Sequence, residues 1–173
     1  MNKNPKAMIT TIDSPLGPVS AGHGAGKVLC LSIGKQSEEH VREVLLDLGY
    51  EPLEGQNRLG EKIARELSEY LKGARSHYTV EPLLSGTDFQ VQVWETLRRI
   101  PYGQVVTYGE LAARAGYPRA ARAVGMAMAR NRIPIIVPCH RVIATNGRLG
   151  GFGCGLEVKR ALLWLEGAKG VAL

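Results

Sequence analysis

The sequence is poor in several features that would assign it to a particular class of protein. Its 173 residues contain three cysteines, too few and too scattered for a disulfide framework, which favours a reducing compartment inside a cell. No apolar run approaches the ~20 residues that a membrane-spanning helix requires, and no signal-peptide pattern follows Met1. These absences argue against a secreted disulfide-bonded protein and against a membrane protein. They predict a cytoplasmic location, or a nuclear one in a eukaryote.

Signatures of cofactor and metal binding are also missing. No glycine-rich fingerprint follows an expected strand, so a bound dinucleotide is not predicted. The residues His23, Cys30 and His40 do not have the spacing of a zinc site. We therefore expect neither a cofactor nor a metal.

Acidic residues are scarce in the second half of the chain. The net charge is +6, but residues 1–86 carry −1 and residues 87–173 carry +7. Between Arg98 and Arg148 there are nine arginines, one acid (Glu110) and no lysine. Arginine suits planar, bidentate contacts to phosphate, so this excess favours nucleic-acid binding over the alternative of a solubilising basic face.

The pattern of apolar residues predicts an α/β (α+β) fold in two parts. Strands are expected at residues 7–12, 19–23 and 28–33, with a further edge strand at 77–80. Helices are expected from Ser37, as N-cap, to a stop at Gly49, and from Asn57 to Leu71. A domain boundary is placed in residues 82–86. It divides the chain into an N-terminal scaffold (1–86) and a mainly helical C-terminal domain (87–173).

The C-terminal half begins with two capping-box patterns, Thr87 with Gln90 and Thr107 with Glu110, each of which opens a helix. A turn at Gly116–Pro118 leads to a further helix over 119–130, and this helix-turn-helix outline is typical of DNA-binding domains. A last helix is expected over 156–166. Because many helical hairpins bind nothing, the outline alone does not settle a function.

The second helix of that pair has little side-chain bulk. Ala121 and its neighbours are mostly alanine or glycine, while Arg119, Arg122 and Arg130 project from it. Small residues allow either tight internal packing or a close approach to a nucleic-acid groove. The projecting arginines favour the groove, so we assign Ala121 and the three arginines to DNA binding.

The most informative stretch is residues 134–155, where an apolar run ends at Pro138 and is followed by Cys139, His140 and Arg141. Prolines do not sit inside helices or central strands, so Cys139 is expected at a chain reversal. A thiol is a nucleophile as thiolate, and we expect His140 and Arg141 to lower its pKa. The alternative is a small buried cysteine in a tight turn.

This stretch closely resembles the Pro-Cys-His-Arg-Val active-site segment of the O6-alkylguanine-DNA alkyltransferases. The similarity runs from about Thr87 to Gly167, roughly half of the chain. It includes Trp94-Glu-x-Leu, Ile100-Pro-Tyr-Gly103, Tyr108-Gly-Glu-Leu-Ala112, Ala120-Ala-Arg-Ala-Val-Gly125, Asn131 and Glu166-Gly167. Residues 12–17 also look like the first hairpin of that family.

The resemblance implies a catalytic group of residues. Cys139 would take the alkyl group, His140 would act on it through a water, and Glu166 would orient His140. A carboxylate near a helix C-terminus is otherwise unfavourable, and pairing with His140 would explain it. Tyr108 would donate to the leaving base and also contact the DNA, and Asn131 would brace the turn that holds the cysteine.

The resemblance also implies the substrate: double-stranded DNA that carries O6-alkylguanine, and with it O4-alkylthymine. Arg122 would replace the extruded base in the stack. Val142, Phe152, Gly153 and Arg141 are assigned to the base pocket. No group would regenerate the alkylated thiol, so each protein molecule, expected to be a monomer, would act once. The resemblance implies no cofactor and no membrane partner.

Two positions depart from the family's pattern. Phe152 stands where many relatives carry tyrosine, which removes a hydroxyl contact, and Cys154 stands where glycine or serine is usual.

Three alternative functions are weighed against this one. A helix-turn-helix regulator with a redox-sensing cysteine would explain the basic half of the chain but not Glu166. A cysteine hydrolase would explain Cys139 and His140, but adjacent residues are poorly placed for a direct hydrogen bond. A base-flipping protein that binds lesions without repairing them would lack the cysteine.

Overall fold

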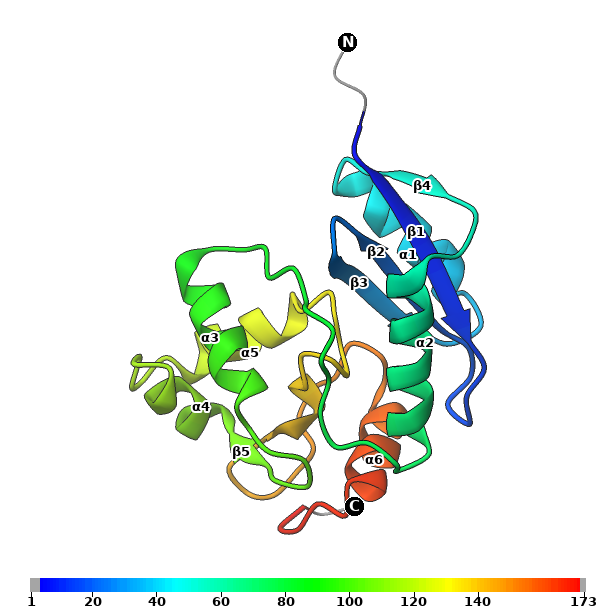
Figure 1. Ribbon diagram of the computed structural model, residues 1–173. Coiled ribbons are helices and arrows are strands. Elements are labelled where there is room, and N and C mark those ends of the chain that lie inside the picture. Colours follow the sequence, from blue (N-terminus) through cyan, green and yellow to red (C-terminus); the bar gives the residue numbers. More distant parts are fainter. Residues whose placement is uncertain (1–3, 172–173) are drawn as a thin grey trace. The chain divides into compact units, whose positions relative to one another are not determined.

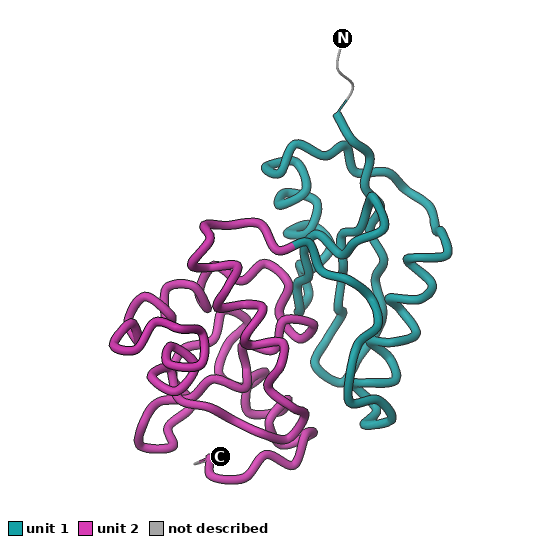
Figure 2. The backbone as a smooth tube through the Cα atoms, turned by 60° about the vertical axis from the view of Figure 1, so that its left-hand side comes forward, with its two compact units in different colours: residues 1–83 teal, residues 84–173 magenta. Residues whose placement is uncertain are grey.

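The computed structural model describes residues 4–171, and the chain forms two compact units, Met1–Leu83 and Leu84–Leu173 (Figure 2). The point of division falls inside the segment 82–86 that the sequence marks as a boundary. Within residues 4–171, no helix has the length and apolar character needed to cross a bilayer.

The first unit is a four-stranded sheet with two helices (Figure 1). Its strand order is β3-β2-β1-β4, where β2 pairs antiparallel with both neighbours and β4 runs parallel to β1. The elements are β1 (Lys6–Ile12), β2 (Val19–Gly24), β3 (Lys27–Ile33), α1 (Ser37–Asp47), β4 (Glu51–Leu53) and α2 (Arg58–Leu71). The three long strands are thus confirmed.

The two helices cover opposite faces of this sheet. On one face, a Cβ added to Gly22 would lie 2.9 Å from Leu45 of α1. On the other face, the next residue, His23, approaches Gly60 of α2, where an added Cβ would lie 2.9 Å from the imidazole. Successive strand residues point to opposite faces of the sheet, and a helix covers each face. Both sides of β2 are therefore buried.

Two expectations for this unit are wrong. Residues 77–80 form no strand, and next to them only Pro82 makes an isolated bridge to Val28 at the β3 edge. The other sheet edge is β4, whose three residues are too few to give a periodic signal. Ser37 is the first helical residue of α1 rather than its N-cap, which is Gln36. The Ser37 hydroxyl is used differently, since it lies 2.8 Å from the Ser20 hydroxyl of β2.

The second unit is mainly helical. Its elements are α3 (Asp88–Arg98), β5 (Val106–Thr107), α4 (Tyr108–Arg114), α5 (Ala121–Ala129), the 3₁₀ turn η1 (Cys139–Arg141), β6 (Val142–Ile143) and α6 (Leu156–Leu165). Both predicted capping boxes are confirmed: the hydroxyl of Thr87 accepts from the Gln90 amide, and that of Thr107 from the Glu110 amide.

Helices α4 and α5 form the expected helix-turn-helix, and α3 packs beside them. The indole of Trp94 on α3 donates a 3.0 Å hydrogen bond to the carbonyl of Ala127 on α5. Helix α5 begins at Ala121 rather than at 119, because Arg119 has φ +79°, which is not helical backbone.

A short parallel pair connects this motif to the cysteine turn. Val106 pairs with Val142, and Thr107 with Ile143, so β5 and β6 lie side by side. Tyr108 directly follows β5 and Arg141 directly precedes β6. The pairing therefore brings the start of α4 next to the turn that carries Cys139.

Candidate active site

Cys139 opens η1 and is buried, with 8% of its surface exposed. The chain on either side of Val137 turns tightly. The Ile136 amide donates to the Pro134 carbonyl at 2.9 Å, and the Cys139 amide donates to the Val137 carbonyl at 2.8 Å. Ile135, inside the first turn, has φ +72°, a strained conformation for a β-branched residue. The chain reversal predicted from the two prolines is thus confirmed.

Asn131 lies against this reversal and contacts three parts of it. Its side-chain amide donates to the Val137 carbonyl at 2.9 Å and to the sulfur of Cys139 at 3.1 Å. Its side-chain oxygen accepts from the Ile133 amide at 3.0 Å. One side chain therefore fixes both the reversal and the sulfur.

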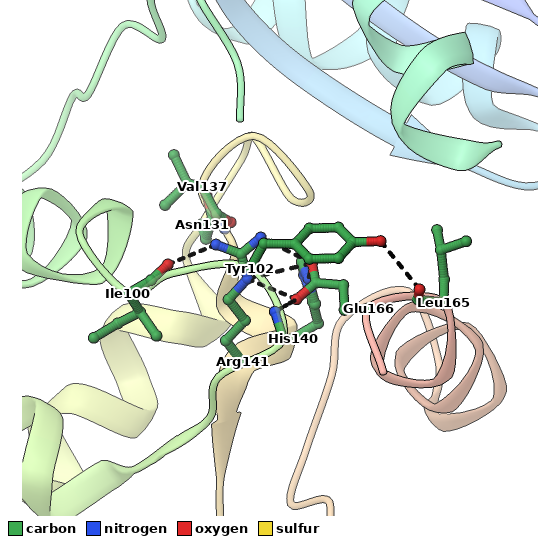
Figure 3. A network of polar contacts seen from close by, with 9 residues as sticks. Ile100, Tyr102, Asn131, Val137, His140, Arg141, Leu165 and Glu166 are labelled. Atoms are coloured by element: carbon green, nitrogen blue, oxygen red, sulfur yellow. Dashed lines mark hydrogen bonds and ion pairs between the residues drawn. The ribbon is translucent and has the colours of Figure 1, made fainter. Parts of the chain in front are cut away.

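Behind the turn lies a buried charged network centred on Glu166 (Figure 3). His140 Nε2 is 2.8 Å from Glu166 Oε1, so the predicted pairing of these two residues is confirmed. Arg141 binds the same carboxylate through Nε at 2.9 Å and through Nη2 at 2.8 Å, and its Nη1 donates to the Ile100 carbonyl at 2.6 Å. The Gly103 amide donates to Glu166 Oε2 at 3.0 Å.

Charge in this network shifts several pKa values. Burial alone would raise the pKa of Glu166, but hydrogen bonds from His140 and Arg141 hold it well below its ordinary value. Burial lowers the pKa of His140, against the opposing effect of Glu166, so the imidazole is neutral near pH 7. The network is thus a carboxylate that holds a neutral imidazole and a guanidinium.

The predicted direction of the pKa shift of Cys139 is wrong. Burial raises the pKa of Cys139 to about 11, and Asn131 and Lys159 offset this only in part. His140 and Arg141 do not lower this pKa, because the imidazole is neutral and the guanidinium pairs with Glu166. The resting thiol is therefore protonated.

A pocket of about 300 Å³ opens above the sulfur. Its lining residues come from the start of α4, from α5, from the cysteine turn and from the glycine loop: Tyr108, Gly125, Met128, Ala129, Cys139, Gly151, Phe152 and Gly153. Burial, with a smaller effect of Cys139, raises the pKa of Tyr108, so its hydroxyl keeps its proton. A proton donor, a thiol and an aromatic ring thus meet in one cavity.

Some residues assigned to the base pocket lie elsewhere. Phe152 and Gly153 line the pocket, but Arg141 does not, since its guanidinium is bound to Glu166 and to the Ile100 carbonyl. Val142 does not line it either, and its carbonyl accepts from Lys159. The assignment of Arg141 is therefore corrected: it supports the network behind Cys139.

Lys159, which no sequence pattern singles out, supports the pocket loop. Its side chain is fully buried, and its ammonium donates to the carbonyls of Val142 at 2.6 Å, of Gly151 at 3.3 Å and of Leu149. Burial lowers the pKa of Lys159 to about 8, and Cys139 opposes that shift. A lysine in a helix normally faces water, so nothing in the sequence reveals this role.

The contact of Gly103 with Glu166 is not predicted from the sequence either. Gly103 has φ +77°, and an added Cβ would lie 2.8 Å from the Glu166 carbonyl, so glycine is required both for the backbone and for the close approach. The Pro-Tyr-Gly pattern at residues 101–103 predicts a turn but does not reveal that the turn packs against Glu166.

The arginines of α5 and of the residues that flank it are exposed. Arg119, Arg122 and Arg130 are exposed, and none of them forms an ion pair with another described residue. Ala121 is half-buried at the first turn of α5. No group of three His, Cys, Asp or Glu side chains in residues 4–171 is arranged as metal ligands would be.

Comparison with known proteins gives consistent results. Residues 88–168 match the family model described as 6-O-methylguanine DNA methyltransferase, DNA binding domain. The chain is 44% identical over 163 residues to a methylated-DNA–protein-cysteine methyltransferase of Mycobacterium tuberculosis, covering 94% of this chain and 93% of the relative. It is 41% identical to the protein of the same name in Methanosarcina barkeri, covering 90% and 94%.

Solved structures of similar proteins have the same fold. The crystal structure of Mycobacterium tuberculosis OGT in complex with DNA has a TM-score of 0.78 and 40% identity, covering 95% of this chain and 96% of that one. An O6-methylguanine-DNA methyltransferase from Pyrococcus kodakaraensis has a TM-score of 0.70 and 29% identity, covering 94% and 99%.

Proposed function

Because this chain belongs to the methylated-DNA–protein-cysteine methyltransferase family, we propose that it repairs double-stranded DNA by moving the alkyl group of O6-alkylguanine onto Cys139. The observation that carries this proposal is the position of Cys139, whose thiol borders a pocket that is also lined by α5 of the helix-turn-helix. O4-alkylthymine presents a similar alkyl-oxygen bond and is a second expected substrate.

The chemistry is a displacement at carbon. The sulfur of Cys139 forms a bond to the alkyl carbon while the bond from that carbon to O6 breaks, and guanine leaves with the electron pair. The leaving base gains a proton from the Tyr108 hydroxyl, which lines the same pocket. The thiol proton passes to His140 and finally replaces the one that Tyr108 gives up.

His140 acts as the base that removes the thiol proton. Its Nε2 is bonded to Glu166, so proton exchange with Cys139 uses Nδ1, through a water. The lowered pKa of His140 keeps the imidazole neutral and able to accept. Once protonated, the imidazolium is stabilised by the Glu166 carboxylate, the orienting role of the acid in nucleophile-base-acid systems.

DNA contacts are assigned to α5 and its approach. Chemistry on a base requires that the base leave the stack, at a cost of about a few kcal/mol. We assign Arg122, which is exposed in the first turn of α5, to the gap that the base leaves in the minor groove. Arg119, Arg130 and Ala121 contact the strand, and Phe152 and Gly153 contact the extruded base.

A mass measurement tests the proposal. The protein is mixed with excess duplex DNA carrying O6-methylguanine, digested with trypsin, and the peptide 133–141 is weighed. It should gain one methyl group per chain, repaired guanine should match it in amount, and activity should then end, because a thioether is a poor leaving group. Repair that continues with Cys139 unmodified would contradict the proposal.

Two serine variants provide the matched comparison. Cys139→Ser should abolish transfer and keep DNA binding with its steep salt dependence. Cys154→Ser should keep transfer, since Cys154 is not among the pocket-lining residues and burial raises the pKa of its thiol to about 12. If Cys154→Ser lost transfer and Cys139→Ser kept it, Cys154 would be the acceptor and the assignment to Cys139 would be wrong.

A further inference from the structure

Helix α5 carries one large apolar side chain on its exposed side. Met126 is 63% exposed, although most of its helix is alanine or glycine. It lies one turn after Arg122 and one turn before Arg130, and residues four apart share a helix face. Single exposed apolar residues are common on protein surfaces, so the position of Met126 rather than its exposure is what needs an explanation.

The other sides of α5 are already occupied. Val124 and Ala127 are buried in the unit, and Gly125 and Met128 line the pocket of Cys139. The remaining face presents a methionine between two exposed arginines. Apart from these arginines, the residues around it are alanine or glycine, and Met126 extends further from the helix than they do.

The charge around Met126 indicates what meets it. No aspartate or glutamate occurs between Glu110 and Glu157, and Arg122 and Arg130 form no ion pair with another described residue. A surface of this kind attracts a polyanion. An apolar side chain at the centre of this basic surface forms no favourable contact with the phosphates that flank a groove. It suits a nucleic acid only where it reaches the bases.

With Arg122 assigned to the gap that the extruded base leaves, the spacing along α5 sets how far Met126 lies from that gap. Four helical residues advance the chain by ~6 Å, which is less than two base steps of ~3.4 Å each. Minor-groove proteins commonly insert methionine or another apolar side chain between base pairs, which unstacks and kinks the duplex. Met126 has the chemistry and the position to do so beside Arg122.

We propose that Met126 is an apolar wedge that enters the base stack next to the nucleotide that Arg122 displaces. This inference rests on the proposed function, because it takes α5 as the helix that meets damaged DNA. The wedge stabilises the unstacked step, so it favours extrusion without touching the pocket. It also predicts faster repair where the neighbouring step is a pyrimidine–purine step, which unstacks easily.

Three substitutions at this one position test the wedge. Met126→Ala removes the side chain, Met126→Gln keeps its length but makes it polar, and Met126→Leu keeps it apolar. All three residues are good helix formers, so α5 should remain intact. The matched control is Leu46→Ala, which removes an exposed apolar side chain (57% exposed) from α1 in the other unit.

Each variant is assayed for transfer from O6-methylguanine in a duplex and from free O6-benzylguanine, which requires no extrusion. A 2-aminopurine next to the lesion reports unstacking by its fluorescence. We expect Met126→Ala and Met126→Gln to slow duplex repair about tenfold, equivalent to ~1.4 kcal/mol, and to lower the fluorescence rise. Met126→Leu and Leu46→Ala should match the wild-type protein, and free-base transfer should be unchanged throughout.

The outcomes separate this inference from the proposed function. If the wild-type protein repairs DNA stoichiometrically and Met126→Ala repairs it equally fast, the wedge is overturned and the proposed function stands. Equal losses on duplex and free base also overturn the wedge, because Met126 then acts on the pocket. A wild-type protein that does not methylate Cys139 overturns the proposed function itself.

Discussion

The side-chain amide of Asn131 lies 3.1 Å from the sulfur of Cys139 and 2.9 Å from the carbonyl of Val137. The same nitrogen therefore holds the reactive atom and the turn that presents it. Because this hydrogen bond favours the thiolate, it lowers the pKa of Cys139 against the larger effect of burial. Removing it should alter both reactivity and stability.

Asn131→Ala should slow the reaction of Cys139 with iodoacetamide at a fixed pH and leave the buried Ile133 amide without its acceptor. Losing such a partner costs about 1–3 kcal/mol in the free energy of unfolding. Alkylation followed by mass spectrometry, together with urea unfolding, measures the two effects. Asn146→Ala, in an exposed turn, is the control and should change neither.

The reactivity of Cys139 should depend steeply on pH. With a pKa of about 11, the thiolate fraction in the resting protein rises about tenfold per pH unit from pH 7 to pH 10. Stability should move the other way, since a thiol whose pKa is raised by folding from 9.0 is stabilising below pH 9 and loses that contribution as the pH rises towards 11. Alkylation rates that level off near pH 8 would contradict this account.

The pair formed by Arg141 and Glu166 should be strongly coupled. Glu166→Gln leaves the buried Arg141 guanidinium uncompensated, which should lower the free energy of unfolding by about 3–5 kcal/mol. Arg141→Met combined with Glu166→Gln should recover part of that loss, because neither charge is then isolated. Urea unfolding of the two single variants and the double variant gives the coupling energy, and strictly additive losses would show that the pair is independent.

Acid should weaken the same network. Folding lowers the pKa of Glu166, so its stabilising contribution is present above its ordinary value near 4.5 and declines as the pH falls below it. Thermal unfolding between pH 3 and pH 6 should show this decline in the wild-type protein and a smaller one in Glu166→Gln. Equal slopes would assign the acid sensitivity to other carboxylates.

Lys159 should matter for the pocket rather than for DNA affinity. Lys159→Met removes the donor that holds the carbonyls of Val142, Leu149 and Gly151 together, so the glycine loop should loosen. We expect transfer from free O6-benzylguanine to slow about tenfold or more, while the affinity for undamaged duplex stays unchanged. Lys169→Met, which changes an exposed lysine, is the control and should leave both unchanged.

Arg122→Ala should distinguish extrusion from chemistry. Repair of a duplex should fall much more than transfer from free O6-benzylguanine, because only the duplex requires a base to leave the stack. Single-turnover rates on the two substrates measure the contrast. Equal losses on both would mean that Arg122 serves the fold or the pocket.

Local signals in the sequence identified much of the architecture. The hydroxyls of Thr87 and Thr107 cap their helices as the residue patterns predict, because a capping box involves only neighbouring residues. The pairing of His140 with Glu166, which are far apart in sequence, came from the family resemblance. No local pattern connects those two positions.

Features set by burial were not predictable in this way. The pKa of Cys139 is determined by the side chains that exclude water from it, and the adjacent His140 and Arg141 indicated the opposite sign. The family resemblance places Arg141 in the pocket, but its partner Glu166 lies behind the turn. Strands of two or three residues, such as β4 and β5, are too short for periodicity to reveal.

The hydrogen bond from Trp94 to the Ala127 carbonyl gives the protein an intrinsic optical reporter. The sequence has two tryptophans: Trp94 is buried against α5, whereas Trp164 is 76% exposed. In a Trp164→Phe background, emission comes from the indole that is bonded to the proposed DNA-contacting helix. Movement of α5 on the duplex can then be followed in real time without an attached dye.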